Sequence, residues 1–361
     1  MNKRITDDLP LCNEMMEDLS NKYQVDTFWK NYQSMNVTLI KHYGLKSFRQ
    51  RPSSYGGIST KKSIIPKGIL LYKIINKLLR GLDKYIGIDW LRFPFLDVFN
   101  FTVDDSRAIR KNYSRLILEM INLLPDGDKL LNIKDDLVGN PSDILKLREN
   151  TYSLQFINYF YRLLVINKFV DFKESNLFLE IGGGYGGFSE VLKKTYPNVK
   201  IIFIDIPPQL YVAERYLKSV FPDKVAGYRD TKQMKSINFD SFSNYDFLML
   251  PPWDVEKIED NLIDNFSNQS SFQEMSKDTV KGYCKQLGRI IKNKVVLYEQ
   301  REGNGVVKDS VKRDDYIRYM ESNGFKLINE KVAIYGGNLR SDPSAPVCHQ
   351  DFYFFQKNKT M

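Results

Sequence analysis

The sequence predicts an α/β fold, with a mostly parallel sheet that ends in an antiparallel hairpin and follows a mostly helical N-terminal region. Three observations predict this fold. Apolar runs alternate with segments of helical period after about residue 150, one apolar run enters a cluster of glycines, and the last two apolar runs have no helix between them. We therefore divide the 361 residues into a helical region, 1–150, and an α/β domain, 151–361.

The glycine cluster is the stretch around which the chain is organised. The apolar run 177–181 reads Leu-Phe-Leu-Glu-Ile and leads into Gly-Gly-Gly-Tyr-Gly-Gly at 182–187. Phe188, Val191 and Leu192 then fall on one face of a helix. This is the pattern of a buried strand, a tight loop and a helix. Glycines let the backbone approach a ligand closely and the helix start offers free N–H groups, so we expect a ligand here.

Acidic residues around the loop indicate which ligand to expect. The loop satisfies the dinucleotide fingerprint G-x-G-x-x-G, which alone is a weak signal. Glu180 stands two residues before the first glycine, and gives E-x-G-x-G-x-G through Gly182, Gly184 and Gly186. A carboxylate there can receive the ammonium group of S-adenosylmethionine. Asp205 ends the next apolar run, where an acidic residue can bind ribose hydroxyls in either class of ligand.

Cysteine usage and hydropathy favour a soluble protein of a reducing compartment. Cys12, Cys284 and Cys348 are widely spaced and odd in number, which argues against a disulfide framework and against a zinc site. The N-terminus has no apolar signal segment after its first residues, and no run of 18 apolar residues occurs. We expect a cytoplasmic protein without membrane insertion.

The net charge of +9 raises the question of a nucleic-acid partner. The lysines are spread along the chain and are not clustered in one stretch. Lysine, asparagine, isoleucine and tyrosine are all abundant, as in chains from AT-rich genomes. We therefore attribute the charge to composition and expect no nucleic-acid partner.

The helical region and the segment that follows it contain several amphipathic stretches. Apolar residues recur at helical spacing over 28–39, 69–79 and 104–124. A further helix is predicted from Ser142 to about Val170, leading into the central strand. Its aromatic residues are expected to be mostly core, with one or two of them roofing the ligand. These aromatic residues are Tyr152, Phe156, Tyr159, Phe160 and Tyr161.

The α/β domain continues with alternating strands and helices. Helices are predicted at 209–220, 276–291 and 314–323. Strands are predicted at 200–204, 245–250, 262–269, 295–298, 325–335 and 351–356. The run 262–269 is a weak strand candidate because it is polar for a central strand. Two registers follow: either 245–250 is the third strand and 262–269 the fourth, or 225–228 is the third and 245–250 the fourth.

Several motifs together resemble the sugar O-methyltransferases found with bacterial surface-polysaccharide genes. The matching motifs are 179–187, 205–208, 250–253 and 271–275, with Phe28-Trp29 and 44–49 in the N-terminal region. The resemblance spans most of the chain and is strongest at the glycine loop. It implies a Rossmann-like class I methyltransferase sheet, S-adenosylmethionine as cofactor and a sugar or saccharide acceptor. It also implies that the helical N-terminal region shapes the acceptor pocket.

With 245–250 as the third strand, the resemblance assigns further site residues. Trp253 and Asp254 should lie beside the adenine, and 270–275 should border the methyl-transfer centre. Gln273 and Glu299 are expected to bind the acceptor, and Glu299 alone does not make a metal site. No metal is expected, and the resemblance leaves a homodimer open.

Methyl transfer to a hydroxyl is an in-line attack that needs a base within reach. His349 opens the final antiparallel strand, which starts at the edge where parallel strands end and ligands bind. Histidine is the default base near neutral pH. A surface or hairpin position without a catalytic role is an equally good interpretation of His349. Glu274 competes for the role, and its alternative is to cap a helix.

Three other functions remain as alternatives. Pro251-Pro252-Trp253 resembles a motif of adenine-N6 methyltransferases, but those enzymes have Asp or Asn before the prolines, and Leu250 has no side-chain acceptor. Glu180 and the closing hairpin count against a nicotinamide-dependent oxidoreductase. The candidate bases count, less decisively, against a binding module without catalysis.

Overall fold

A computed structural model describes residues 5–22, 27–50, 118–119, 121–141, 144–174, 177–303, 309–332 and 350–358. The helix predicted at 69–79, most of the one at 104–124, and His349 lie outside these residues. Within them, no helix combines the length and the apolarity that crossing a bilayer requires.

The centre of the molecule is an eight-stranded sheet in the order β5-β6-β4-β3-β7-β8-β10-β9. Neighbouring strands among β3 to β8 pair in parallel. Strand β10 runs antiparallel to both β8 and β9. The strands are β3 (Leu177–Ile181), β4 (Lys200–Ile204), β5 (Val225–Ala226), β6 (Phe247–Leu250), β7 (Ile263–Gln269), β8 (Ile291–Gln300), β9 (Phe325–Val332) and β10 (Gln350–Lys357). This arrangement confirms the predicted fold class, including the terminal antiparallel hairpin.

The strand pairing decides between the two registers. β6 pairs with β4, and β7 lies between β3 and β8, so the first register is correct. The segment 225–228, which is the third strand in the other register, contains only the two-residue edge strand β5. The polar strand β7 is tolerated at the centre because several of its polar side chains find partners. Asp264 accepts the backbone N–H of Leu177 at 2.9 Å and pairs with Lys292 at 2.6 Å.

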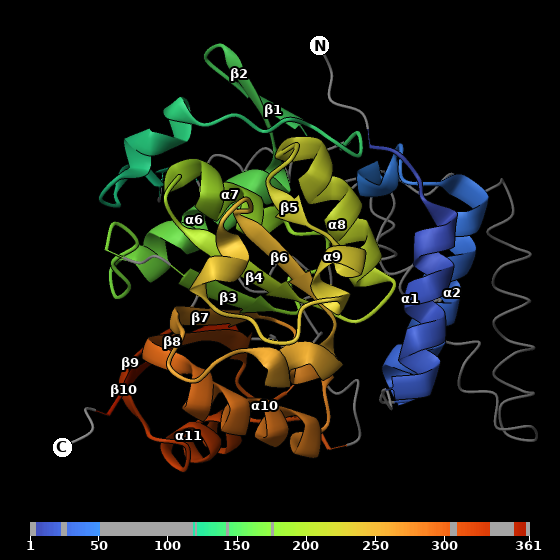
Figure 1. Cartoon of the computed structure of the whole chain (residues 1–361). Helices are drawn as coiled ribbons and strands as arrows, with labels where there is room; N and C mark the ends of the chain where they lie inside the picture. The colour runs from blue at the N-terminus through green and yellow to red at the C-terminus, as the bar shows by residue number, and fades with distance from the viewer. Residues whose placement is uncertain are drawn as a thin grey trace, which may run out of the picture.

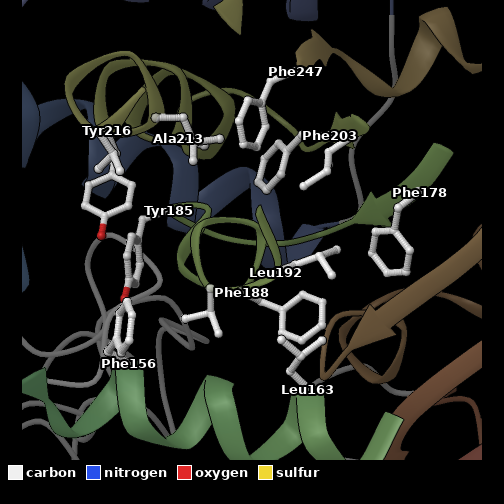
Figure 2. Close-up of a cluster of buried hydrophobic side chains, with 14 of the residues drawn as sticks. Phe156, Leu163, Phe178, Tyr185, Phe188, Leu192, Phe203, Ala213, Tyr216 and Phe247 are labelled. Carbon is white, nitrogen blue, oxygen red and sulfur yellow. The ribbon is translucent and has the colours of Figure 1, made fainter. Parts of the chain in front are cut away.

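Helices cover both faces of the sheet (Figure 1). On one face lie α6 (Leu154–Asn167), α7 (Gly187–Thr195) and α8 (Gln209–Val220), and on the other α10 (Lys277–Ile290) and α11 (Arg313–Glu321). Figure 2 shows how the first face packs: Phe178, Phe203 and Phe247 from the strands meet α7 and its neighbours. The strands β3, β4, β6, β8 and β10 contribute alternate residues to the two cores, which is why they read as nearly continuous apolar runs.

The N-terminal helices pack against the half of the sheet that carries β4 and β6. Helix α1 (Leu9–Lys22) lies beside α8 and α9 (Tyr228–Lys232) in Figure 1. Glu14 pairs with Arg229 at 2.7 Å, and Asp18 pairs with Lys232 at 2.6 Å. Helix α2 (Thr27–Tyr43) reaches the turn after β4, where Gln33 donates to the carbonyl of Pro207 at 2.7 Å. The division of the chain at residue 150 stays a prediction.

The helix predicted from Ser142 to Val170 is wrong in its first part. Residues 144–153 form a hairpin, β1 (Ile144–Leu147) and β2 (Asn150–Ser153), and α6 begins only at Leu154. Arg148 adopts a positive φ of 53° in the hairpin turn, and the Ser153 hydroxyl caps the helix by accepting the N–H of Phe156 at 3.2 Å. Asp135 accepts the N–H of Ser153 at 2.9 Å, a contact that local periodicity does not reveal.

A buried ion pair of the N-terminal region lies against the α/β domain. Arg49, in the short turn η1 (Phe48–Gln50), donates to both oxygens of Asp135 at 3.3 and 3.4 Å. Its guanidinium also lies 5.3 Å from the ring centre of Tyr185 and 5.9 Å from that of Tyr216. Burial alone would raise the pKa of Asp135, but Arg49 and hydrogen bonds from Ser153 outweigh burial and hold this pKa below its usual value.

We predict that Arg49→Met lowers the free energy of unfolding by about 3–5 kcal/mol, because it leaves the Asp135 carboxylate buried without its cation. Urea unfolding followed by circular dichroism measures the change. Lys129→Met is the control: Lys129 pairs with Asp126 at 3.2 Å, with about a third of each side chain exposed, and should cost less than about 1 kcal/mol. Equal losses in the two variants would contradict the role given to Arg49.

Candidate functional site

The glycine loop lies in direct contact with the segment that follows β7. Gly182 has a φ of +72°, and a Cβ atom there would stand 2.0 Å from the hydroxyl oxygen of Ser271. A side chain at this position is therefore excluded both by backbone conformation and by space. The predicted loop and the predicted methyl-transfer segment meet at the carboxyl ends of β3 and β7.

Asp205, at the end of β4, is hydrogen-bonded to the loop, and its predicted contact with ribose hydroxyls stays a prediction. Its Oδ2 accepts the backbone N–H of Gly184 at 2.9 Å, and its Oδ1 accepts that of Ile206 at 2.8 Å. Burial raises the pKa of Asp205 to about 7, against the two backbone hydrogen bonds, which lower it. A carboxylate has about four acceptor positions, so further hydrogen bonds to a ligand are open to it.

Glu180 lies at the base of the loop and is only 1% exposed. A Cβ on Gly183 would come within 2.7 Å of its carboxyl carbon, and the Ser189 hydroxyl donates to its Oε2. Burial raises the pKa of Glu180 to about 7, and the charge of Asp205 adds to this. Sequence reasoning missed Ser189, although its place two residues into α7 is within reach of the strand end.

Trp253 and Asp254 follow β6 in the turn η5 (Pro252–Lys257). The backbone N–H of Asp205 donates to the carbonyl of Leu250 at 3.4 Å, so this turn starts at the same edge of the sheet. Asp254 is buried and pairs with Lys257 at 3.0 Å. Trp253 is partly buried and packs against the hydrophobic core on the sheet face that α6, α7 and α8 cover. Their contact with an adenine stays a prediction.

Asn268 links the predicted methyl-transfer segment to the end of β3, just before the glycine loop, and sequence reasoning did not find it. Its Nδ2 donates to the carbonyl of Ile181 at 2.7 Å, and its Oδ1 accepts the N–H groups of Ser271 and Phe272 at 3.2 and 2.9 Å. The signal in the sequence is an asparagine near the end of a predicted central strand, where a polar side chain needs a hydrogen-bond partner. From the sequence alone, the polarity of this run only ranks it as a weak strand candidate.

Gln273 and Glu299 are brought together. The Oε2 of Glu299 accepts the backbone N–H of Gln273 at 3.1 Å, and the side chain of Gln273 accepts the N–H of Gln300 at 2.8 Å. Glu299 is fully buried, its Oε1 has no hydrogen-bond partner among the described residues, and burial raises its pKa well above the usual value. These contacts hold the turn η6 (Phe272–Glu274), which carries Glu274, against the end of β8.

Of the two candidate bases, only Glu274 belongs to the residues that the structure describes. Glu274 is half-buried in η6, at the end of the sheet where the glycine loop lies. His349 lies outside the described residues; β10 starts at the next residue, Gln350, whose backbone pairs with Gln300 and whose side chain donates to the Ser270 hydroxyl at 2.7 Å. The catalytic assignment of both residues stays a prediction. In the part of the chain that the structure describes, no cluster of three acidic, histidine or cysteine side chains is arranged for a metal ion.

Comparison with known proteins identifies one matching domain. Residues 156–230 match the family model described as an O-methyltransferase domain. This match starts in α6 and ends in α9, and so covers Glu180, the glycine loop and Asp205. No curated protein matches the chain.

Solved structures that resemble the chain share little sequence with it. A candidate sarcosine dimethylglycine methyltransferase from Galdieria sulphuraria has 13% identity and a TM-score of 0.39, covering 56% of this chain and 86% of its own. A magnesium protoporphyrin IX methyltransferase from Synechocystis PCC 6803, with bound S-adenosylmethionine, has 10% identity and a TM-score of 0.37, covering 78% and 96%. A methyltransferase from Aquifex aeolicus has 14% identity and a TM-score of 0.34, covering 54% and 87%.

Proposed function

We propose that the chain is an S-adenosylmethionine-dependent O-methyltransferase that transfers a methyl group to a sugar hydroxyl. The observation that carries the proposal is the meeting of two buried carboxylates, Glu180 and Asp205, at a glycine loop within the segment that matches an O-methyltransferase domain. Two acidic groups beside a loop suit a ligand that carries an ammonium group, a sulfonium and two ribose hydroxyls.

Each part of the cofactor has residues to receive it. The amino-acid end lies on the Glu180 side of the loop, the ribose hydroxyls hydrogen-bond Asp205, and the adenine lies beside Trp253 and Asp254. Gly182, Gly184 and Gly186 have positive φ angles, a conformation that glycine adopts readily. Because these residues also have no side chains, the backbone of the loop can pass close to the ligand. The bound cofactor supplies the electrophilic methyl group.

The acceptor lies against the turn that follows β7, where Gln273 and Glu299 bind its hydroxyls. This turn contacts Gly182, so an acceptor there reaches a methyl group presented from the loop. The resemblance to sugar O-methyltransferases of bacterial surface-polysaccharide synthesis supports a sugar as the acceptor, and the helical N-terminal region shapes its pocket. Orientation supplies much of the rate, because the leaving sulfide is neutral and needs no stabilisation.

The alternatives fit the residues less well. An adenine-N6 methyltransferase needs a side-chain acceptor for the target amine before the two prolines, and Leu250 offers none. A dinucleotide places its pyrophosphate on the glycine loop. The charge of Glu180 beneath this loop, when ionised, repels a phosphate and attracts an ammonium group.

Calorimetric titration should show that S-adenosylhomocysteine binds and that NAD does not bind comparably. The affinity should rise roughly fivefold to tenfold from about pH 6 to about pH 7.5, because Glu180, with a pKa raised to about 7, loses its proton over this range and attracts the ligand's ammonium group as an anion.

Gly184→Val should abolish this binding, since Gly184 has a φ of +61° and valine disfavours that conformation and fills the path of the ligand. Gly282→Val is the control, because a side chain at Gly282 in α10 meets nothing within 4 Å. Tight NAD binding without S-adenosylhomocysteine binding would reject the cofactor, and an affinity that falls as the pH rises would reject the role of the carboxylates.

Purified protein should transfer a labelled methyl group from S-adenosylmethionine to a hydroxyl of nucleotide-activated sugars or polysaccharide fragments. Mass spectrometry of the digested product locates the label. A label on adenine of DNA or RNA, with none on sugars, would show that Leu250 does not exclude amine methylation and would replace the proposed function.

His349→Ala should lower turnover by roughly 10²- to 10⁴-fold if His349 takes the proton of the hydroxyl. Cofactor affinity should barely change, and the pH–rate profile should lose its limb near neutrality. His42→Ala changes the chain's other histidine, which is exposed on α2, and should be silent.

Glu274→Gln separates the two candidate bases. Normal turnover in His349→Ala, together with an inactive Glu274→Gln that still binds cofactor, would assign the base to Glu274. Full activity in both variants would show that neither side chain is the base.

A further inference from the structure

Arg162 in α6 lies against the carboxyl end of the sheet. Its guanidinium stands 4.3 Å from the ring centre of Tyr298 and 5.5 Å from that of Tyr159. Its Nη1 donates to the side-chain carbonyl of Gln269 at 3.3 Å. The two rings hold the plane of the guanidinium, and the glutamine holds one of its corners. The position of this cation is therefore fixed by α6, β7 and β8 together.

The charge of Arg162 is not balanced within the described part of the chain. No carboxylate oxygen of the described residues forms an ion pair with it, whereas the buried Arg49 has Asp135. Its Nε is fully buried and without a hydrogen-bond partner, as is the Nε2 of the neighbouring Gln269. Arginine carries five N–H donors in a planar fork. An immobilised, partly buried fork with open donors suits an anion with two oxygens.

The place of Arg162 indicates which part of a ligand it meets. Gln269 follows Asn268, which pairs with Ile181 across β7 and β3, so it lies level with the start of the glycine loop. The ring of Tyr159 would stand 2.6 Å from a Cβ on Gly187, and the charge of Glu180 helps to raise the pKa of the Tyr159 hydroxyl after burial, the larger cause. Arg162 is thus one helical turn from a ring that lies against the loop and within the electrostatic reach of Glu180.

We propose that Arg162 binds a carboxylate in the ligand site, and that this is the α-carboxylate of the methyl donor. An α-amino acid carries its ammonium and carboxylate groups on the same carbon, so a donor with its ammonium toward Glu180 has its carboxylate within a few ångströms. Glu180 and Arg162 match these two charges. This inference rests on the proposed function. An anionic group on the acceptor, a sugar carboxylate or phosphate, is the other source of the same chemistry.

Two ligands that differ only in the amino-acid end test the proposal. S-adenosylhomocysteine carries the carboxylate, and 5′-methylthioadenosine lacks the whole amino-acid end. In calorimetric titrations Arg162→Met should weaken binding of S-adenosylhomocysteine roughly 10- to 100-fold and leave that of 5′-methylthioadenosine within about twofold of wild type. Arg162→Lys should fall between, because it keeps the charge and loses the fork.

The control is Arg215→Met. Arg215 in α8 also donates to neutral groups, the carbonyl and hydroxyl of Thr6, but at a distance from the loop, and its loss should change neither titration. Retained binding of 5′-methylthioadenosine also shows that the Arg162 variants are folded.

Each outcome has one meaning. Equal weakening of both ligands would overturn the proposal, since Arg162 would then support the site's structure only. Unchanged S-adenosylhomocysteine binding with a raised KM for an anionic acceptor, and a normal KM for a neutral one, would keep the anion site and assign it to the acceptor. No change in any of these measurements would overturn it. Failure of the wild-type protein to bind either ligand would reject the proposed function instead, before any variant is compared.

Discussion

The close contact of the glycine loop with its surroundings is the constraint on which the rest of the site depends. The Ser271 side chain lies so close to Gly182 that a Cβ atom there would not fit, and the N–H of Gly184 donates a hydrogen bond to Asp205. One short loop is thereby fixed to the ends of β7 and β4 on either side of β3. Because parallel strands end at a common edge, these contacts gather at one place the groups proposed to bind the cofactor and the turn proposed to border the acceptor.

The N-terminal region extends this constraint. Arg49 stacks on Tyr185, which belongs to the glycine loop, and on Tyr216 of α8, whose hydroxyl donates to Glu190 of α7. Figure 2 shows Tyr185 and Tyr216 in the same aromatic cluster as Phe156 of α6. The loop is thus packed by elements from three parts of the chain. The N-terminal region, far from the loop in sequence, helps to fix its position, on which the proposed cofactor site depends.

The sheet could be predicted from the sequence because burial on both faces makes its strands apolar, and the loop because glycine has few other reasons to cluster. The hairpin at 144–153 could not, since Asp135 and Arg49, distant in sequence, fix the start of α6 at Ser153. Asn268 and Arg162 were missed for a related reason. Both side chains contact residues that are distant in sequence and adjacent in the sheet. A local sequence pattern does not predict which polar side chain forms such a contact.

A crystal structure of the protein with S-adenosylhomocysteine tests the central claim most directly. The account predicts the ribose hydroxyls on Asp205, the adenine beside Trp253 and Asp254, and the amino-acid end over the glycine loop between Glu180 and Arg162. Electron density for the ligand away from Gly182 and Asp205, or with its ribose and amino-acid ends exchanged, would contradict it.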